Sequence, residues 1–207
     1  MAVLDSGFQP GYEDKMNTVL ELNAITTTDE NGNVIKSDDD YLYSSNLHGD
    51  IVAQIIGSVN YGLAPNVELQ NIVVSSEALT VKYADIQYGI MFAEQNNADI
   101  LNISISPSFA DFRIADDTFR DSLEDGSFAK SLEESLDRLD EKNIIVIRAA
   151  GNDRNNVSEQ VTAYDATATY QGWVQTFLKD NVIYVGASYG QGDDLASWSG
   201  YAGNNSD

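Results

Sequence analysis

The 207-residue chain has no cysteine, a single histidine, and only 11 basic residues against 33 acidic ones, which gives a formal net charge of −22. Without cysteine the protein has no disulfide scaffold, no cysteine-ligated metal site and no thiol nucleophile. One histidine excludes a histidine-rich metal centre and leaves His48 as the one candidate imidazole base. The acidity argues against nucleic acid and anionic membrane surfaces as partners, because both would repel this chain.

Long apolar runs are also missing. No stretch approaches the roughly 18 consecutive apolar residues of a membrane span, and no basic segment followed by an apolar one marks a signal peptide. The content of 43% hydrophobic and 10% aromatic residues still fits a folded protein with a core. Lack of cysteine is compatible with bacterial secreted proteins and with cytosolic ones, so composition leaves the compartment open.

Short apolar runs alternate with amphipathic stretches along the chain. We expect strands at 2–4, 67–74, 100–105, 144–149 and 182–187, and helices at 50–59, 83–95 and 128–141. In the first of these helices, the residues predicted to form one apolar face are Ile51, Ile55, Ile56 and Val59. Continuous apolar strands separated by helices indicate a parallel sheet covered on both faces. The predicted fold class is therefore α/β, a three-layer αβα arrangement with a mostly parallel central sheet, in a single domain over 1–207.

Two regions depart from this alternation. Asn31-Gly32 lies between a Thr-rich and a Val/Ile segment, which favours a hairpin turn. Residues 153–181 are polar with scattered aromatics, and we interpret them as an excursion between two strands.

Reactive side chains occur where predicted parallel strands end, the edge at which open sheets bind ligands. Asp5 follows the first strand, Asn152 follows the strand at 144–149, and His48 precedes the helix at 50–59. Each residue by itself is typical of a turn or of a helix start. Their order along the chain carries more information than any one of them.

That order resembles the subtilisin-like serine proteases, the subtilase family. Val3-Leu4-Asp5-Ser6-Gly7 resembles the Asp motif of the family, and His48-Gly49-Asp50-Ile51-Val52-Ala53 resembles its His motif. Ile145-Val146-Ile147-Arg148-Ala149-Ala150-Gly151-Asn152 resembles the strand that leads to its oxyanion asparagine. Further ordered matches lie at 62–69, at 98–104, and at 182–187 followed by 195–199. The resemblance extends through nearly the whole chain and implies a subtilisin-like fold.

The resemblance also implies a serine endopeptidase that hydrolyses peptide bonds through an Asp-His-Ser triad. His48 would be the general base, Asp5 would orient its imidazole, and Asn152 would donate its amide to the oxyanion. Ser104-Ile105-Ser106 and Ala149-Ala150-Gly151 would form the two walls of the pocket for the residue before the scissile bond. The first wall would also pair with an extended polypeptide substrate. A bacterial secreted or cell-surface location is the corresponding expectation, with the cytoplasm left open.

The chain departs from the family pattern in several places. The nucleophile motif Gly-Thr-Ser-Met-Ala-x-Pro is absent, so we expect an incomplete catalytic domain that is inactive by itself, with the serine beyond residue 207. Asp50 stands where Thr is usual, Gln54 where Gly is common, and Ser106-Pro107 where Gly-Gly is common. The short loop at 58–62 lacks the Asn-rich insertion that binds calcium in many relatives, so neither this calcium site nor any other metal or cofactor is predicted.

Two alternatives remain open at this point. A catalytically inactive pseudoprotease or peptide-binding module would keep the fold and the groove without a nucleophile. An α/β domain that binds a small ligand would need a Gly-rich phosphate loop after a strand, and the sequence has none. The sequence gives no indication of the oligomeric state.

Overall fold

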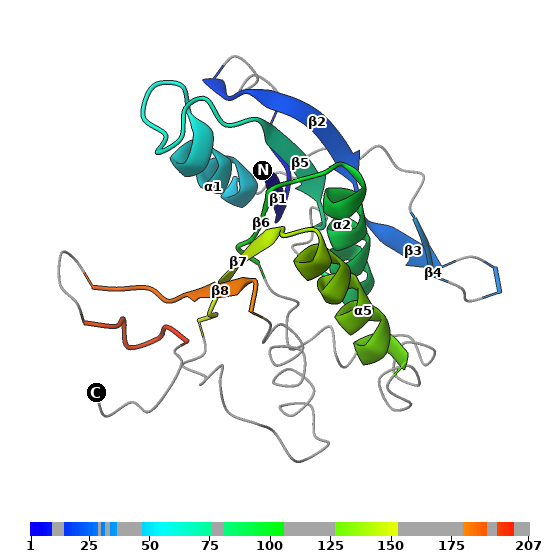
Figure 1. Cartoon of the computed structure of the whole chain (residues 1–207). Helices are drawn as coiled ribbons and strands as arrows, with labels where there is room; N and C mark the ends of the chain where they lie inside the picture. The colour runs from blue at the N-terminus through cyan, green and yellow to red at the C-terminus, as the bar shows by residue number, and fades with distance from the viewer. Residues whose placement is uncertain are drawn as a thin grey trace.

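A six-stranded parallel sheet forms the centre of the computed structural model (Figure 1). The structure describes residues 1–9, 15–28, 30–31, 34–36, 47–75, 81–105, 127–152, 180–189 and 194–200. The strand order is β2-β5-β1-β6-β7-β8, and every neighbouring pair is parallel. The strands are β1 (Ala2–Asp5), β2 (Thr18–Asn23), β5 (Leu69–Val73), β6 (Ile100–Ile103), β7 (Ile145–Ala149) and β8 (Val182–Val185). This order places β1 and β6 at the middle of the sheet.

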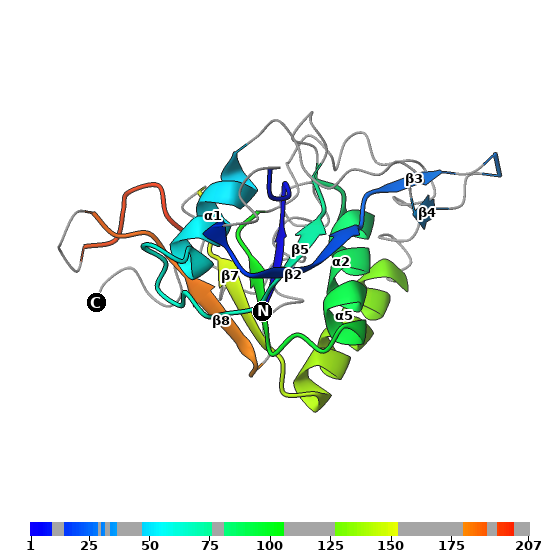
Figure 2. The ribbon, with the colours of Figure 1, turned by 90° about the horizontal axis from the view of Figure 1, so that it is seen from above.

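Helices cover the sheet from opposite sides, as Figures 1 and 2 show. They are α1 (His48–Gly57), α2 (Tyr83–Gln95) and α5 (Ser127–Glu141). Side chains alternate between the two faces of a strand, and β1 uses both faces. Leu4 belongs to the core shared with α2 and α5, whereas Val3 packs with Ala53 of α1. The predicted three-layer α/β fold with a parallel sheet is confirmed.

The element predictions agree with the structure in type and nearly in extent. All five predicted strands and all three predicted helices are present, and the helix over 83–95 has the predicted bounds. The antiparallel pair β3 (Thr26–Thr28) and β4 (Val34–Lys36) confirms the hairpin around Asn31. Its Gly32 lies outside the described residues, as do 153–179 of the predicted excursion. The edge strand β2 was not predicted, because its polar and half-exposed residues interrupt the apolar run by which the other strands were recognised.

Of the apolar face predicted for the first helix, Ile56 packs partly against the core, and the other three residues do not. Ile51, Ile55 and Val59 are each more than half exposed. The residues that α1 buries instead are Gly49, Asp50, Ala53 and Gly57. A Cβ atom on Gly57 would lie 2.9 Å from a methyl of Val67, so the backbone of α1 packs closer to the sheet than branched side chains allow. Helical spacing therefore located the helix, but of the four residues predicted to be buried only Ile56 contacts the core.

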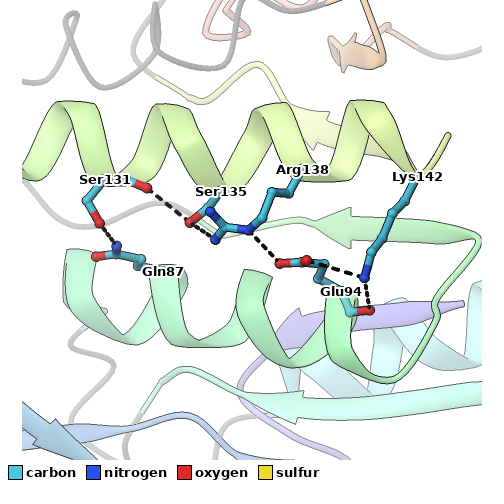
Figure 3. A network of polar contacts seen from close by, with 6 residues as sticks. All are labelled: Gln87, Glu94, Ser131, Ser135, Arg138 and Lys142. Carbon is cyan, nitrogen blue, oxygen red and sulfur yellow. Dashed lines mark hydrogen bonds and ion pairs between the residues drawn. The ribbon is translucent and has the colours of Figure 1, made fainter.

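The packing of α2 against α5 combines an apolar seam with a polar rim. Their buried apolar side chains are Ile86, Ile90 and Ala93 of α2 and Leu132, Leu136 and Leu139 of α5. Along the rim, Arg138 and Lys142 reach Glu94 at 3.0 and 3.3 Å, and Gln87 hydrogen-bonds to Ser131 (Figure 3). Although burial acts to raise it, the hydrogen bonds from Arg138 and Lys142 hold the pKa of Glu94 below its usual value.

A buried carboxylate joins the hairpin to the first turn of α2. Asp85 accepts hydrogen bonds from the backbone N–H of Thr26 at 2.7 Å and from its hydroxyl at 2.5 Å. Lys82 donates from its Nζ to the carbonyl of Thr26 at 2.6 Å. Burial raises the pKa of Asp85 to about 6, against the effect of its hydrogen bonds and of Lys82. This contact lies on the side of the sheet opposite to α1.

The seam and the rim between α2 and α5 should contribute very differently to stability. Leu136→Ala removes a fully buried side chain and is expected to lower the free energy of unfolding by about 2–5 kcal/mol. Glu94→Gln weakens ion pairs whose basic partners are well exposed, so it should cost less than about 1 kcal/mol. Chemical denaturation of both variants measures the difference. Equal losses in the two variants would contradict this assignment of the stabilising contacts.

Candidate active site

The centre of the candidate site is the carboxyl end of β1. Asp5 is the last residue of this strand and is fully buried. Its Oδ1 accepts a hydrogen bond from the backbone N–H of Ser6 at 2.8 Å. Among the described residues, no hydrogen-bond partner is found for Oδ2. Because a buried carboxylate is costly unless it is paired, the position of this side chain depends strongly on its neighbours.

His48 contacts Asp5 directly across a separation of 43 residues. Its Nδ1 lies 2.8 Å from Oδ1 of Asp5, while the histidine side chain is 45% exposed. The hydrogen bond to Asp5, supported by the charge of that carboxylate, raises the pKa of His48 above its ordinary 6.5, although burial acts to lower it. A half-exposed imidazole held by a buried carboxylate is suited to general base work near neutral pH.

The first turn of α1 is joined to the loop after β1 by further hydrogen bonds. Leu47 precedes the helix and makes no side-chain capping bond. Ser6 Oγ instead accepts a hydrogen bond from the N–H of Gly49 at 3.0 Å. Asp50 Oδ1 accepts one from the N–H of Gln9 at 2.9 Å. The helix that carries His48 is thus capped from the segment that carries Asp5.

The predicted first wall follows β6, which lies between β1 and β7 in the sheet. Ser104 and Ile105 come directly after this strand and are partly buried. Asn102 donates from its Nδ2 to Ser104 Oγ at 2.9 Å. The third predicted residue of this wall, Ser106, lies outside the described residues.

The predicted second wall follows β7 at the same edge of the sheet. Ala149 ends the strand, Ala150 is buried, Gly151 has a positive φ of 92°, and Asn152 is exposed. A positive φ is accessible to glycine at little cost, so Gly151 lets the chain turn at this edge and present Asn152 to solvent. The structure therefore brings Asp5 and His48 into contact and places Ser104, Ile105, the segment 149–151 and Asn152 at the ends of neighbouring strands.

One contact in this region was not predicted. Gly200 lies directly against the second wall: its N–H donates to the carbonyl of Gly151 at 2.9 Å. A Cβ atom at Gly200 would lie 2.0 Å from the carbonyl oxygen of Ala150, so no other residue fits without backbone movement. In the sequence, the neighbouring segment 195–199 resembles a family motif, but it did not predict that Gly200 would contact the second wall.

The described part of the chain shows neither a metal-binding cluster nor a membrane-spanning helix. It holds no group of three or more His, Asp or Glu side chains placed to bind a metal ion. It also has no helix with the length and apolar character needed to cross a bilayer.

The contact between Asp5 and His48 can be tested by titration. Asp5→Asn removes the charge and replaces the carboxylate acceptor, so the pKa of His48 should fall below its value in the unaltered protein. In the unaltered protein, a raised pKa means that the contact stabilises the fold fully below pH 6.5 and that this stabilisation is lost as the pH rises through the raised value. NMR titration of the imidazole, identified by its loss in His48→Ala, measures the shift. An unchanged pKa in Asp5→Asn would contradict the contact.

Comparisons with known proteins show which sequences and folds this chain is similar to. The model of the Subtilase family matches residues 1–206. Subtilisin DY from Bacillus licheniformis is 30% identical over 157 residues, which are 73% of this chain and 46% of that protein. The chain thus spans about half the length of this relative.

Solved structures show the same fold. The epidermin leader peptide processing serine protease from Staphylococcus aureus matches with a TM-score of 0.64 and 17% identity, over 97% of this chain and 50% of that one. The nisin leader peptidase from Lactococcus lactis matches with a TM-score of 0.61 and 20% identity, over 97% of this chain and 58% of that one. At these identities the likeness concerns the fold. From the family match, the relative and the parallel sheet with its helices, we conclude that this chain belongs to the subtilase family.

Proposed function

We propose that this chain supplies the base, the orienting carboxylate and the oxyanion donor of a serine endopeptidase. The reaction is the hydrolysis of peptide bonds in polypeptides, with a serine nucleophile from a segment outside these 207 residues. The observation that carries the proposal is the 2.8 Å contact between His48 Nδ1 and Asp5 Oδ1, in a chain of the subtilase family. A bacterial secreted or cell-surface location is part of the same proposal.

The chemistry assigned to the dyad follows from which atoms face each other. Because Nδ1 faces Asp5, the other ring nitrogen, Nε2, takes the proton from the serine hydroxyl and returns it to the leaving amine. Asp5 holds the imidazole in the required tautomer and stabilises the imidazolium that forms. The half-exposed histidine and the fully buried aspartate fit these roles, since the base must reach substrate and the carboxylate need not.

The oxyanion and substrate roles are assigned to the neighbouring strand ends. Asn152 follows β7 and is exposed, so its amide can be presented to the carbonyl oxygen that becomes negatively charged. We assign Ser104-Ile105-Ser106 to one wall of the substrate pocket and Ala149-Ala150-Gly151 to the other. An extended peptide would add to the first wall as a strand. This assignment needs no metal in any step.

We propose that the nucleophile segment packs on an apolar face of the sheet that is exposed within the described part of the chain. Val182 and Tyr184 of β8 pack towards α2 and α5, whereas Ile183 and Val185 point to the other side and are about half exposed. This is the side on which α1 lies, and there Ile51 and Ile55 are exposed as well. Soluble proteins rarely leave such a set of large apolar side chains uncovered. We therefore assign this face, beside the helix of His48, to the segment that carries the serine.

Activity and labelling of the intact protein test the proposed reaction. A serine-directed fluorophosphonate should label it and block peptide hydrolysis. His48→Ala should abolish turnover and leave the circular dichroism spectrum unchanged. Asn152→Ala should lower kcat about a hundred- to a thousandfold, the range known for loss of one oxyanion-hole donor in a related enzyme.

Heat-unfolded protein serves as the control, because labelling that survives unfolding does not require the site. Absence of labelling and of turnover in the folded, intact protein would contradict the endopeptidase and favour the peptide-binding alternative. Turnover of His48→Ala at the rate of the unaltered protein would contradict the assigned base.

A matched pair of valines tests whether the apolar face is covered in the intact protein. Val185 on β8 and Val19 on β2 lie on the two edge strands, and each is 51% exposed. If the nucleophile segment packs on β8, Val185→Thr buries a hydroxyl and should cost about 1–3 kcal/mol of unfolding free energy. Val19→Thr should stay within about 0.5 kcal/mol. Denaturant titrations of the intact protein measure both, and equal small effects would show that β8 is not covered.

A further inference from the structure

Asp50 is a buried carboxylate at a position where the family motif usually has a threonine. It lies in the first turn of α1, two residues after His48, and is 1% exposed. Its Oδ1 accepts a hydrogen bond from the N–H of Gln9 at 2.9 Å. Within the described ranges, Oδ2 has no hydrogen-bond partner. Burial raises the pKa of this carboxyl above its usual value, against the effects of the Gln9 hydrogen bond and the charge of Lys15.

The environment of Asp50 indicates that its burial is costly for stability. A buried carboxylate is disfavoured unless hydrogen bonds and charges compensate it, and here one of its two oxygens accepts from Gln9. The start of a helix favours an acidic side chain by only about 0.3–1 kcal/mol. Stability alone therefore does not explain why position 50 is an aspartate. Its contact with the loop after β1 explains it better.

Three polar contacts connect the loop after β1 to the first turn of α1. Asp5 contacts His48, Ser6 accepts from Gly49, and Gln9 donates to Asp50. The Gln9 contact is the one farthest along the loop from Asp5. Without it, the loop would lose the one of these three contacts that ties its far end to the helix, and those of Ser6 and Asp5 would remain. Small shifts of the loop would then change the 2.8 Å distance on which the orientation of His48 depends.

We propose that Asp50 is a positioning residue for the reaction, which accepts the N–H of Gln9 and thereby holds Asp5 at the correct distance from His48. This inference rests on the proposed function, because it concerns the same dyad. It differs from a general role in stability, because what matters is an acceptor oxygen at this position and not its charge.

Two substitutions separate the acceptor from the charge. Asp50→Asn keeps an oxygen that can accept from Gln9 and removes the charge, whereas Asp50→Ala removes both. In the intact protein, Asp50→Asn should keep kcat within about threefold, and Asp50→Ala should lower it about ten- to a hundredfold, as expected for a misplaced catalytic group. The low-field NMR resonance of the proton between His48 and Asp5 should persist in Asp50→Asn and weaken or disappear in Asp50→Ala.

A matched control is available on the opposite side of the sheet. Asp85 is also a 1% exposed carboxylate in the first turn of a helix, and it also accepts a backbone N–H from a distant segment. Asp85→Asn and Asp85→Ala should change the unfolding temperature and leave both the His48 resonance and kcat unchanged. If Asp50→Ala does not fold, Ser6→Ala removes the neighbouring contact at the same junction and should weaken the same resonance.

The outcomes distinguish this inference from the proposed function. Loss of stability in Asp50→Ala with an unchanged resonance and unchanged kcat would overturn the positioning role. Equal losses in Asp50→Asn and Asp50→Ala would overturn it too, because charge and not the acceptor would then be decisive. If the unaltered protein has no peptidase activity, the proposed function fails, and the resonance still decides whether Asp50 controls the contact between His48 and Asp5.

Discussion

The close approach of α1 to the end of β1 is the constraint on which the candidate site depends. A Cβ atom on Gly49 would lie 2.6 Å from the carbonyl oxygen of Gly7, so only glycine allows the helix to start at this distance. Gly7 itself has a positive φ of 87°, which turns the chain immediately after Asp5 and Ser6. With both glycines in place, the residue before Gly49 lies within hydrogen-bond distance of a carboxylate at the end of a buried strand. The same approach explains why Gly49, Ala53 and Gly57 lie on the fully buried side of α1, while Ile51 and Ile55 are exposed.

Asp5, Asp50 and Asp85 are buried carboxylates, and each has different hydrogen-bond partners and a different place in the fold. Asp5 is held by the N–H of Ser6 and by His48, at the edge where the strands end. Asp50 connects α1 to the loop after β1, and Asp85 connects α2 to the hairpin. In each case the carboxylate accepts a backbone N–H from another segment or from the next residue, which offsets part of the cost of burial. The net charge of −22 belongs mostly to the rest of the acidic residues and explains none of these three contacts.

The distribution of apolar side chains over the two faces of the sheet is unequal. On the side of α2 and α5, the apolar side chains of the strands are buried under the helices. On the side of α1, a smaller core surrounds Val3 and Ala53, while Ile183 and Val185 of β8 stay exposed. Since burial of apolar surface is the main driving force of folding, the second face is the one on which additional protein can be stabilised. It is also the side of the sheet on which α1, the helix that begins with His48, lies.

Much of this protein was predictable from local patterns in the sequence. Continuous apolar runs such as 182–185 and the helical spacing of Leu132, Leu136 and Leu139 predicted the sheet and its covering helices, because burial imposes these periods directly. The order of Asp5, His48 and Asn152 predicted that they would gather at one sheet edge. The bounds of α2 were predicted correctly for the same reason, since its apolar spacing is regular and its ends are polar.

Other properties were decided only by the tertiary structure. The sequence by itself determined the fold class, the positions of the main elements and the candidate residues, because each depends on the spacing of residue types along the chain. It did not determine which side of α1 is buried, since periodicity finds an apolar stripe without showing what packs on the opposite one. It also could not show that Ser6 and Asp50 join α1 to the loop after β1, or that Gly200 lies against Ala150. Those contacts connect residues far apart in the chain, and only the packing of the folded backbone brings them within hydrogen-bond distance.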